Sequence, residues 1–340
     1  GIYTLEKGKT YYTSNSGLMD LRIEISRYLE RRFGLNYDAE KEIIVTVGGS
    51  EGIDLAFRAM LNPGDEVIIP EPCYVSYVPC VTLADGVPVT VNLKEENDFK
   101  LTKEQLLSAI TPRTKILVLA FPNNPTGAVM TKEELEEIAE VVKEKDIFVV
   151  SDEIYAELSY GNTRHCSIAS IDGMKERTIV INGFSKAHAM TGWRLGYACG
   201  PEVIIKQMLK IHQFAIMCAP TNSQYAAVEA LRECDDAVEE MRNEYDRRRR
   251  FMLSKLRGMG LKVFEPYGAF YIFPNIAEFG LTSDEFATRF LTEEKVAVVP
   301  GTAFGDCGEG FLRMSYASSL SNLKTAMERL EKFIDRLRNK

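Results

Sequence analysis

The sequence predicts an α/β fold in which a mostly parallel sheet of seven strands lies between helices, with a smaller α+β unit at the C-terminal end. Two observations support this prediction. Short β-branched runs alternate with longer helical patterns through the first two thirds of the 340 residues, which is typical of a parallel sheet covered on both faces. From about residue 235 onward, one long charged helix is followed by short strands and two helices, which indicates a second unit.

The strands of the large unit are predicted at Ile43–Val47, Val67–Pro70, Val87–Val91, Lys115–Ala120, Phe148–Ser151, Thr178–Asn182 and Leu195–Cys199. After the first strand, helical spacing places five apolar side chains on one face: Ile53, Ala56, Phe57, Met60 and Leu61. Asn62-Pro63-Gly64 would end that helix. Thr131-Lys132-Glu133-Glu134 resembles a capping box that opens a helix running to about Lys145.

The C-terminal unit is predicted to follow a helix over Asp235–Gly260. Its strands and helices are expected at Lys262–Phe264, Ala269–Phe273, Ser283–Thr292, Val296–Val299, Phe311–Tyr316 and Leu320–Arg338. The predicted domains are residues 15–245 for the large one and residues 246–340, together with 1–14, for the small one.

Charge and hydropathy exclude several classes of function. The net charge of -8 and the pI near 5.3 argue against a surface for nucleic acid or for an anionic membrane, because either partner would be repelled. The one basic run, Arg247 to Arg250, is interpreted as a solvated helix face. No apolar stretch approaches the roughly 20 residues of a membrane helix, and the start from Gly1 to Lys7 has no signal-peptide core.

Cysteine and histidine residues give no sign of a metal site. Seven cysteines are an odd number without any Cys-x-x-Cys pair, so neither a disulfide framework nor a zinc site is expected, and a cytoplasmic location is predicted. His165, His188 and His212 have no metal-ligand spacing. We interpret His188, which is near Lys186, as a packing or supporting residue.

The loop after the first strand, Gly48-Gly49-Ser50-Glu51, leads into a helix. Backbone N–H groups and the helix dipole at such a place favour a phosphate. The spacing matches neither G-x-G-x-x-G nor the Walker A motif, which argues against NAD and ATP. A tight glycine turn without any ligand is the structural alternative.

Two later loops carry polar groups at strand ends. Phe121-Pro122-Asn123-Asn124-Pro125-Thr126-Gly127 forms a rigid loop able to fix an asparagine, although a simple turn is the alternative. In Asp152-Glu153-Ile154-Tyr155, the Asp152 carboxylate can pair with a protonated pyridine nitrogen. Tyr155 can donate to a phenolate oxygen.

A lysine and an arginine follow the sixth strand. Lys186 is either a solvated surface lysine or a Schiff-base nucleophile, which needs a partly enclosed place where its pKa can fall. Arg194 can bind a phosphate through two N–H groups, with the Ser185 hydroxyl as a second donor. A Ser-Lys hydrolase is disfavoured because no Ser-x-x-Lys context is present. Together the four loops suit one cofactor with a phosphate, a pyridine nitrogen and a phenolic oxygen.

These motifs resemble those of the class I/II aminotransferases, which are pyridoxal 5′-phosphate (PLP) enzymes of fold type I and include aspartate aminotransferase. The resemblance covers essentially the whole chain and rests on Phe121–Gly127, Ser151–Tyr155, Ser185–Lys186 with Ala189–Tyr197, and Phe311–Ser315, in the family's order. It implies the PLP-transferase fold, with a large domain, a small C-terminal α+β domain and a homodimer with shared active sites. Relatives usually begin some tens of residues earlier, with an arm that crosses the dimer.

The resemblance implies catalytic roles for Lys186, Asp152 and Tyr155. Lys186 would form the Schiff base with PLP and later move a proton between the substrate Cα and the cofactor C4′. Asp152 would hold the proton on the pyridine nitrogen, while Asn124 and Tyr155 would hydrogen-bond the ring oxygen O3′. Tyr74 would stack on the ring.

The other implied contacts hold the phosphate and the substrate. The phosphate would be bound by backbone groups of Gly49, Ser50 and Glu51, by Ser185 and Arg194 and, from the partner subunit, by Tyr12. Arg313 matches the arginine that binds the substrate α-carboxylate, with Asn124 and Tyr74 also at the substrate. The plainer alternatives are a surface strand arginine for Arg313 and a helix-entry aromatic for Tyr12. Many relatives have a serine where Gly183 stands, so Ser185 is expected to compensate.

The predicted reaction is transamination from an L-amino acid, with aspartate or an aromatic amino acid as the expected donor, to a 2-oxo acid such as 2-oxoglutarate. Gly268-Ala269-Phe270-Tyr271 is expected to line the pocket for the donor side chain. One alternative is a carbon–sulfur β-lyase on the same fold, which would eliminate a β-leaving group. Another is a non-catalytic PLP-binding regulatory module, which the presence of Lys186 and Arg313 disfavours.

Overall fold

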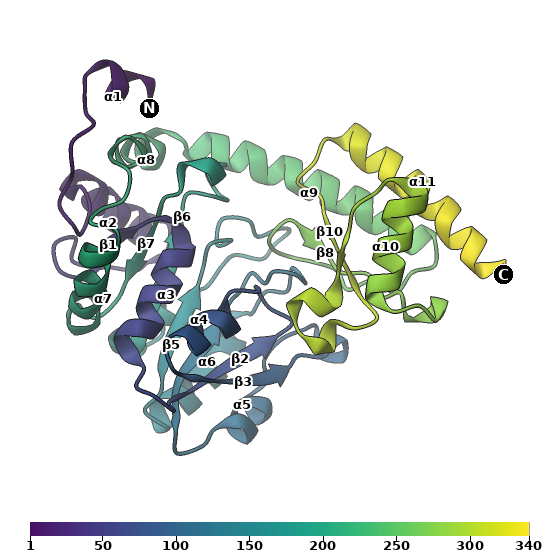
Figure 1. The fold of residues 1–340 in the computed structure, drawn as a ribbon, viewed down its shortest axis with the longest axis horizontal. Helices are drawn as coiled ribbons and strands as arrows, with labels where there is room; N and C mark the ends of the chain where they lie inside the picture. The colour runs from purple at the N-terminus through teal and green to yellow at the C-terminus, as the bar shows by residue number, and fades with distance from the viewer. Residues whose placement is uncertain (340) are drawn as a thin grey trace.

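The computed structural model describes residues 1–339, which form a large sheet between helices and a smaller C-terminal part (Figure 1). The large sheet has seven strands in the order β1-β7-β6-β5-β4-β2-β3. Strand β7 is antiparallel to both of its neighbours, and the remaining pairs are parallel. The strands are β1 (Ile43–Thr46), β2 (Glu66–Glu71), β3 (Val87–Asn92), β4 (Thr114–Leu119), β5 (Phe148–Asp152), β6 (Thr178–Gly183) and β7 (Gly196–Cys199).

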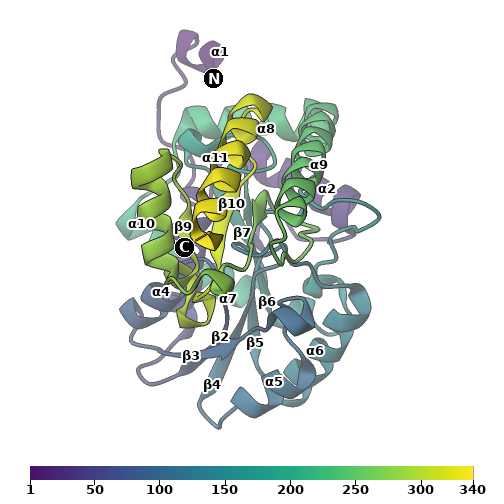
Figure 2. The same cartoon turned by 90° about the vertical axis from the view of Figure 1, so that its right-hand side faces the viewer.

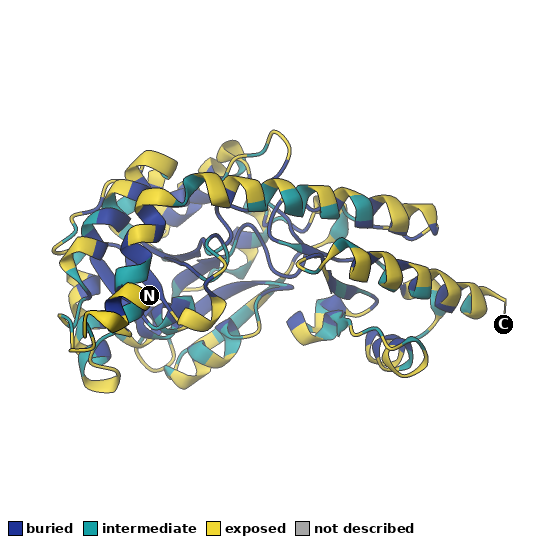
Figure 3. Ribbon diagram, turned by 90° about the horizontal axis from the view of Figure 1, so that it is seen from above, coloured by how far each residue is buried: buried dark blue, intermediate teal, exposed yellow. Residues whose placement is uncertain are grey.

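Helices cover both faces of this sheet, so its strands, apart from the edge strand β3, form a largely buried layer in Figure 3. Successive strand residues point to opposite faces, and Val149 and Val150 therefore belong to different apolar clusters. One face packs against α3 (Gly48–Met60), α4 (Tyr77–Leu83) and α7 (Glu202–Ala215). The other packs against α2 (Met19–Phe33), α5 (Lys103–Ala109), α6 (Lys132–Glu144) and α8 (Thr221–Glu233).

The carboxyl ends of β1, β2, β4, β5 and β6 meet at one edge of the sheet. Strand β1 points the same way as the parallel strands because it is antiparallel to β7, which is itself antiparallel to β6. Loops that leave this edge bring together residues that are far apart in the sequence. Ligand sites of open α/β sheets lie at this edge.

The C-terminal part follows the long helix α9 (Asp235–Gly258), which connects it to the large sheet (Figures 1 and 2). A three-stranded antiparallel sheet in the order β8-β10-β9 lies there with α10 (Ser283–Glu294) and α11 (Leu320–Arg338). Its strands are β8 (Tyr271–Ile272), β9 (Val299–Pro300) and β10 (Leu312–Ser315). Phe286, Phe290 and Phe333 pack together between the two helices and are fully buried.

The N-terminal segment lies beside α8. Its helix α1 (Ile2–Glu6) extends away from the body in Figure 1. The Tyr11 hydroxyl lies 3.1 Å from the Tyr225 hydroxyl, and Thr221 Oγ1 donates to the Tyr11 carbonyl over 2.6 Å. The division into residues 15–245 and residues 246–340 with 1–14 stays a prediction, although these contacts join the segment to α8 and α9 continues unbroken across residue 245.

The predicted large sheet is confirmed, with all seven strands within one residue of their predicted bounds. The capping box at Thr131 and Glu134 is also confirmed at the start of α6. The helices predicted at 235–260, 283–292 and 320–338 appear as α9, α10 and α11. None of the helices within residues 1–339 is long and apolar enough to cross a membrane.

Several smaller predictions are wrong. The strand predicted at 262–264 is only an isolated bridge between Val263 and Pro274, because Pro274 has no N–H with which to extend a ladder. The strand predicted at 269–273 shortens to β8, since Ala269 has a φ of 58°, outside the β region. The strand predicted at 296–299 moves to β9. The predicted turn 48–51 is instead the first turn of α3, because Val47 already takes the N-cap position.

Candidate active site

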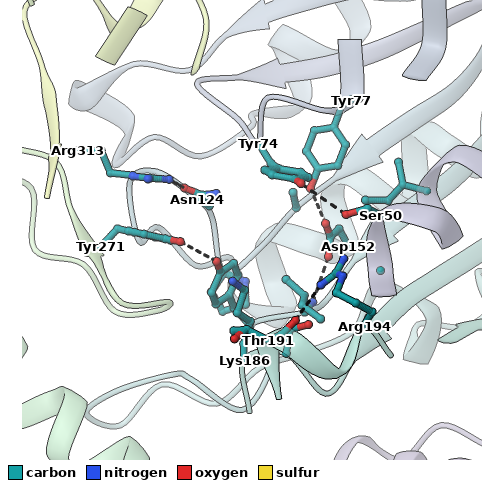
Figure 4. Close-up of a pocket in the computed structure, with 17 residues that line it drawn as sticks. Ser50, Tyr74, Tyr77, Asn124, Asp152, Lys186, Thr191, Arg194, Tyr271 and Arg313 are labelled. Atoms are coloured by element: carbon teal, nitrogen blue, oxygen red, sulfur yellow. Dashed lines mark hydrogen bonds between the residues drawn. The ribbon is translucent and has the colours of Figure 1, made fainter. Parts of the chain in front are cut away.

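A cavity of about 260 Å³ opens at the carboxyl edge of the large sheet, where the C-terminal part faces it (Figure 4). Its walls come from the segments that follow β1, β2, β4, β5 and β6, and from β8 and β10. The structure brings together there all of the predicted catalytic, cofactor-binding and substrate-binding residues except Glu51 and Tyr12, namely Gly49, Ser50, Tyr74, Asn124, Asp152, Tyr155, Ser185, Lys186, Arg194 and Arg313. Of the stretch 268–271 that was expected to line the donor pocket, only Tyr271 lines the cavity.

One end of the cavity combines the first turn of α3 with Arg194. Gly48 has a φ of 76°, and a Cβ there would lie 2.8 Å from Arg194 Nη2, so glycine allows the guanidinium to lie against the helix N-terminus. Arg194 Nη1 also donates to the Thr191 carbonyl over 3.0 Å, which fixes the side chain. Gly49 and Ser50 line the cavity beside it. A helix N-terminus and a guanidinium together form a site suited to a phosphate.

Asp152 ends β5 and is buried at the base of the cavity. The Tyr77 hydroxyl donates to its Oδ2 over 2.7 Å, and the Ile154 N–H donates to Oδ1 over 3.1 Å. Burial raises the pKa of Asp152, while these two hydrogen bonds to its ionised form oppose the rise. A cationic N–H group in the cavity would favour the ionised carboxylate further.

Tyr77 is not among the site residues predicted from the sequence. This residue lies three positions after Tyr74, and its ring meets the Tyr74 ring edge to face, with the centroids 5.7 Å apart. The signal available in the sequence was that spacing, because residues at i and i+3 lie on one side of a helical turn.

Lys186 lies half-buried between the two ends of the cavity (Figure 4). Its Nζ is 5.7 Å from the centre of the Tyr155 ring and 5.4 Å from that of Phe270. Burial lowers the pKa of the Lys186 amine, and the positive charges of Arg313 and Arg194 lower it further, against the opposing effect of Asp152. A lowered pKa gives the amine a larger neutral fraction, which a nucleophile or proton acceptor requires.

The opposite end of the cavity contains Arg313 on β10. Arg313 Nη1 donates to Asn124 Oδ1 over 2.9 Å, and its guanidinium lies 4.4 Å from the centre of the Tyr271 ring. The hydroxyls of Tyr155 and Tyr271 are 3.0 Å apart, and burial raises the pKa of Tyr155 well above its usual value. This end therefore presents a guanidinium and two phenol hydroxyls, which suit a carboxylate.

Two of the residues predicted to bind the cofactor phosphate, Glu51 and Tyr12, do not line the cavity. The Glu51 side chain turns away from it, since Oε2 accepts a hydrogen bond from the Val47 N–H and Oε1 lies 2.6 Å from His212 Nδ1. Tyr12 is 75% exposed on the N-terminal segment. Within residues 1–339, no group of three or more His, Cys, Asp or Glu side chains could hold a metal ion.

Comparison with known proteins finds matches over nearly the whole chain. The family model described as aminotransferase class I and II matches residues 5–330. A putative aminotransferase, YugH, from Bacillus subtilis is 52% identical, covering 98% of this chain and 86% of its own length. An aspartate aminotransferase from Pyrococcus abyssi is 49% identical, covering 97% and 85%.

Solved aminotransferase structures are also similar to this chain over nearly its whole length. An aromatic aminotransferase from Pyrococcus horikoshii superposes with a TM-score of 0.97 at 47% identity, covering 99% of this chain and 91% of the other.

Proposed function

The chain belongs to the aminotransferase class I and II family and is an aminotransferase of PLP fold type I, and we propose that its cofactor is PLP, held through Lys186. The proposed reaction moves an amino group from an L-amino acid, aspartate or an aromatic one, to a 2-oxo acid such as 2-oxoglutarate. One observation carries this proposal. A single cavity holds a half-buried lysine amine with a lowered pKa between two separate anion sites, at Arg194 and at Arg313.

The residues of the cavity fit this cofactor. The missing side chain at Gly48 leaves a cradle between Arg194 and the first turn of α3 that suits a phosphate. Asp152 suits a pyridinium N–H because it is a buried carboxylate whose raised pKa a positive partner would bring down. Ser50, Ser185 and Thr191 add hydroxyl groups to the lining.

When bound, PLP supplies an electron sink for the electron pair of the substrate Cα–H bond. Lys186 Nζ would accept the proton from the substrate Cα, because its lowered pKa favours the neutral amine. Asp152 would keep the proton on the ring nitrogen, and the hydrogen bond from Tyr77 holds its carboxylate in place. Asn124 and Tyr155, which line the same wall, would orient the ring oxygen.

Arg313 would bind the α-carboxylate of the substrate. Its side chain lies between the rings of Tyr271 and Phe304, at 4.4 Å and 4.7 Å from their centres. Such packing on two aromatic faces fixes the plane of a guanidinium and so prepares it for a two-point contact with a carboxylate.

The cavity walls favour an aromatic donor over aspartate. Among the residues that line it, the cations are Lys186, Arg194 and Arg313, and each has a proposed role already. The lining also includes the rings of Tyr74, Tyr77, Tyr155 and Tyr271 and the apolar side chains of Ile53, Ile154 and Pro122. An aromatic side chain would bury its apolar surface against such walls, whereas a second carboxylate would need a positive group from outside this lining.

We also propose a homodimer in which Tyr12 of each subunit reaches the phosphate site of the other. Large apolar side chains are exposed along the N-terminal segment and the nearby loops: Ile2, Tyr3, Leu5, Tyr11, Tyr12, Trp193, Phe214, Ile216 and Met217. Apolar patches of this kind support a protein interface. All seven cysteines are free thiols, which supports a cytoplasmic setting.

The absorption spectrum of the protein with PLP tests the proposal. We expect a visible band from the lysine-bound cofactor, and its replacement by the band of pyridoxamine phosphate when an L-amino acid is added without any oxo acid. A panel of amino acids ranks the donors, and phenylalanine or tyrosine should convert the band at lower concentration than aspartate. A protein that forms no visible band with PLP would contradict the proposal.

The β-lyase alternative gives a different result in the same cuvette. A lyase would keep its visible band while releasing pyruvate and ammonia from a cysteine conjugate. The transaminase should instead release no pyruvate from that conjugate and should lose the band.

A further inference from the structure

A buried glutamate–histidine pair lies behind the first turn of α3. Glu51 is on α3, and His212 is on the last turn of α7, which packs on the same face of the large sheet. The His212 side chain is fully buried, and its Nδ1 lies 2.6 Å from Glu51 Oε1. The other carboxylate oxygen, Oε2, accepts a short hydrogen bond from the Val47 N–H. One carboxylate therefore ties together the end of β1, the start of α3 and the end of α7.

Packing alone does not explain these residue types. The Nε2 atom of His212 is buried and has no hydrogen-bond partner within the described chain, which is a cost that an apolar side chain would avoid. The Glu51 side chain is also largely buried. Buried polar groups of this kind indicate a functional role. The functional region next to the pair is the phosphate end of the cavity, which Gly49 and Ser50 line.

The pair encloses the segment that lines the phosphate end. Gly48, Gly49 and Ser50 lie between Val47 and Glu51 in the chain. The hydrogen bond from the Val47 N–H to the Glu51 carboxylate therefore closes this turn. Gly49 and Ser50 line the cavity, whereas Glu51 does not. Backbone N–H groups bind a phosphate well only when their directions are fixed in advance.

The charge of Glu51 creates a second requirement. A carboxylate in the first turns of α3 would compete with a phosphate for the positive end of the helix dipole. A histidine Nδ1–H donates to that carboxylate whether the ring is neutral or charged, and so draws the negative charge toward α7.

We propose that His212 is a positioning residue for the cofactor phosphate, acting through Glu51 on the first turn of α3. The inference rests on the proposed function, because it requires PLP in the cavity. It assigns His212 a place in cofactor binding although the side chain is fully buried on the far side of Glu51.

Binding of two ligands to the apoenzyme separates this role from a general structural one. The holoenzyme is freed of cofactor and titrated with PLP and with pyridoxal, which lacks the phosphate. The ratio of the two dissociation constants then reports the contribution of the phosphate alone. For His212→Leu we expect the PLP affinity to fall about tenfold, with the pyridoxal affinity within about twofold of that of the unmodified protein.

Three further variants sharpen the test. His212→Gln keeps a side-chain N–H that can reach Glu51, and it should restore most of the PLP affinity. Glu51→Gln in the His212→Leu background removes the repelling charge, and it should recover part of the loss. Lys206→Ala, on the exposed face of α7, should leave both affinities unchanged.

The outcomes are distinct. Equal loss of PLP and pyridoxal affinity in His212→Leu, or no loss of either, overturns the inference. If His212→Leu fails to fold in a urea titration, His212→Phe, which also lacks a donor to Glu51, takes its place, and an unchanged ratio of the two dissociation constants in that variant overturns the inference. Absence of PLP binding in the unmodified apoenzyme would instead refute the proposed function.

Discussion

The end of the cavity around Asp152 and Arg194 and the end around Arg313 share one space but come from different parts of the chain. Asp152 ends β5 of the large sheet, and Lys186 and Arg194 lie in the segment that follows β6. Arg313 and Tyr271 instead lie on β10 and β8 of the small antiparallel sheet. Among the contacts that cross between these parts, one runs from Arg313 to Asn124 and another joins the hydroxyls of Tyr155 and Tyr271.

This difference suggests a division of labour. The large sheet fixes the groups that would hold the cofactor, because five strand ends meet at one edge of a continuous ladder. The small sheet presents the group for the substrate carboxylate, and the side chains of Arg313 and Tyr271 contact the large-sheet part through side-chain hydrogen bonds. Changes at the large-sheet end should therefore abolish the chemistry, whereas changes at the small-sheet end should weaken substrate binding.

Removing the lysine amine should have the largest effect. For Lys186→Ala we expect kcat to fall by at least about 10⁴-fold, because the change removes both the covalent anchor and the proton acceptor. The measurement is a single-turnover conversion of the bound cofactor with the best donor. Lys210→Ala, exposed on α7, serves as the control, and comparable rates for the two variants would contradict the role of Lys186.

Neutralising Asp152 should have the next largest effect. For Asp152→Asn we expect kcat to fall about a thousandfold, because an amide cannot favour a proton on the ring nitrogen. The absorption spectrum and kcat with a saturating donor give the result, and Asp146→Asn, which changes an exposed carboxylate before β5, is the control. An unchanged kcat with a raised KM would indicate that Asp152 acts on substrate binding. The two ends of the cavity would then not differ in their roles.

The two ends also differ in how far the sequence predicted them. At the large-sheet end, Asn124, Asp152 and Lys186 lie at or within five residues of the ends of strands with a clear apolar pattern, so local sequence was enough to bring them to one edge. Arg313 was assigned only through the family resemblance, since β10 is a short strand with no distinctive pattern of its own. The strand predicted at 262–264 failed in this same part of the chain.

Contacts between distant segments were the features that the sequence did not reveal. The hydrogen bond from Tyr77 to Asp152 joins residues 75 positions apart, and the Glu51–His212 pair spans 161 positions. Glu51 lies in the first turn of α3, next to two residues that line the cavity, but the direction of its side chain depends on the packing of α3 against α7. Neither helix pattern contains that information.

Replacing the arginine at the small-sheet end should change binding more than turnover. For Arg313→Lys we expect KM for the amino donor to rise about thirtyfold and kcat to change by less than about fivefold, because lysine cannot make the planar two-point contact. Steady-state kinetics with both substrates measure this split. Arg289→Lys on α10 is the matched control in the same part of the chain. A fall in kcat as large as that of Asp152→Asn would show that the two ends do not divide the work.

The smallest expected effect concerns Tyr77, which donates a hydrogen bond to Asp152. The direction of its effect on the pKa of Asp152 can be stated in advance. Burial raises the pKa of Asp152, and the hydrogen bond from Tyr77 opposes that rise by favouring the ionised form. Tyr77→Phe removes this opposition, so the pKa of Asp152 should rise further. Since activity requires the ionised carboxylate and is lost as the pH falls through this pKa, the acid limb of the kcat/KM profile should move to higher pH.

At neutral pH we expect kcat/KM of Tyr77→Phe to be about tenfold lower, the usual cost of one hydrogen bond to a charged group. Tyr37→Phe removes a hydroxyl that is also buried but lies in the cluster around α2 and β1, away from the cavity, and its pH profile should match that of the unmodified protein. An acid limb that stays in place for Tyr77→Phe would mean that Asp152 is held ionised by the cofactor alone. The charge of the Asp152 carboxylate would then be set by the bound cofactor and not by the surrounding protein.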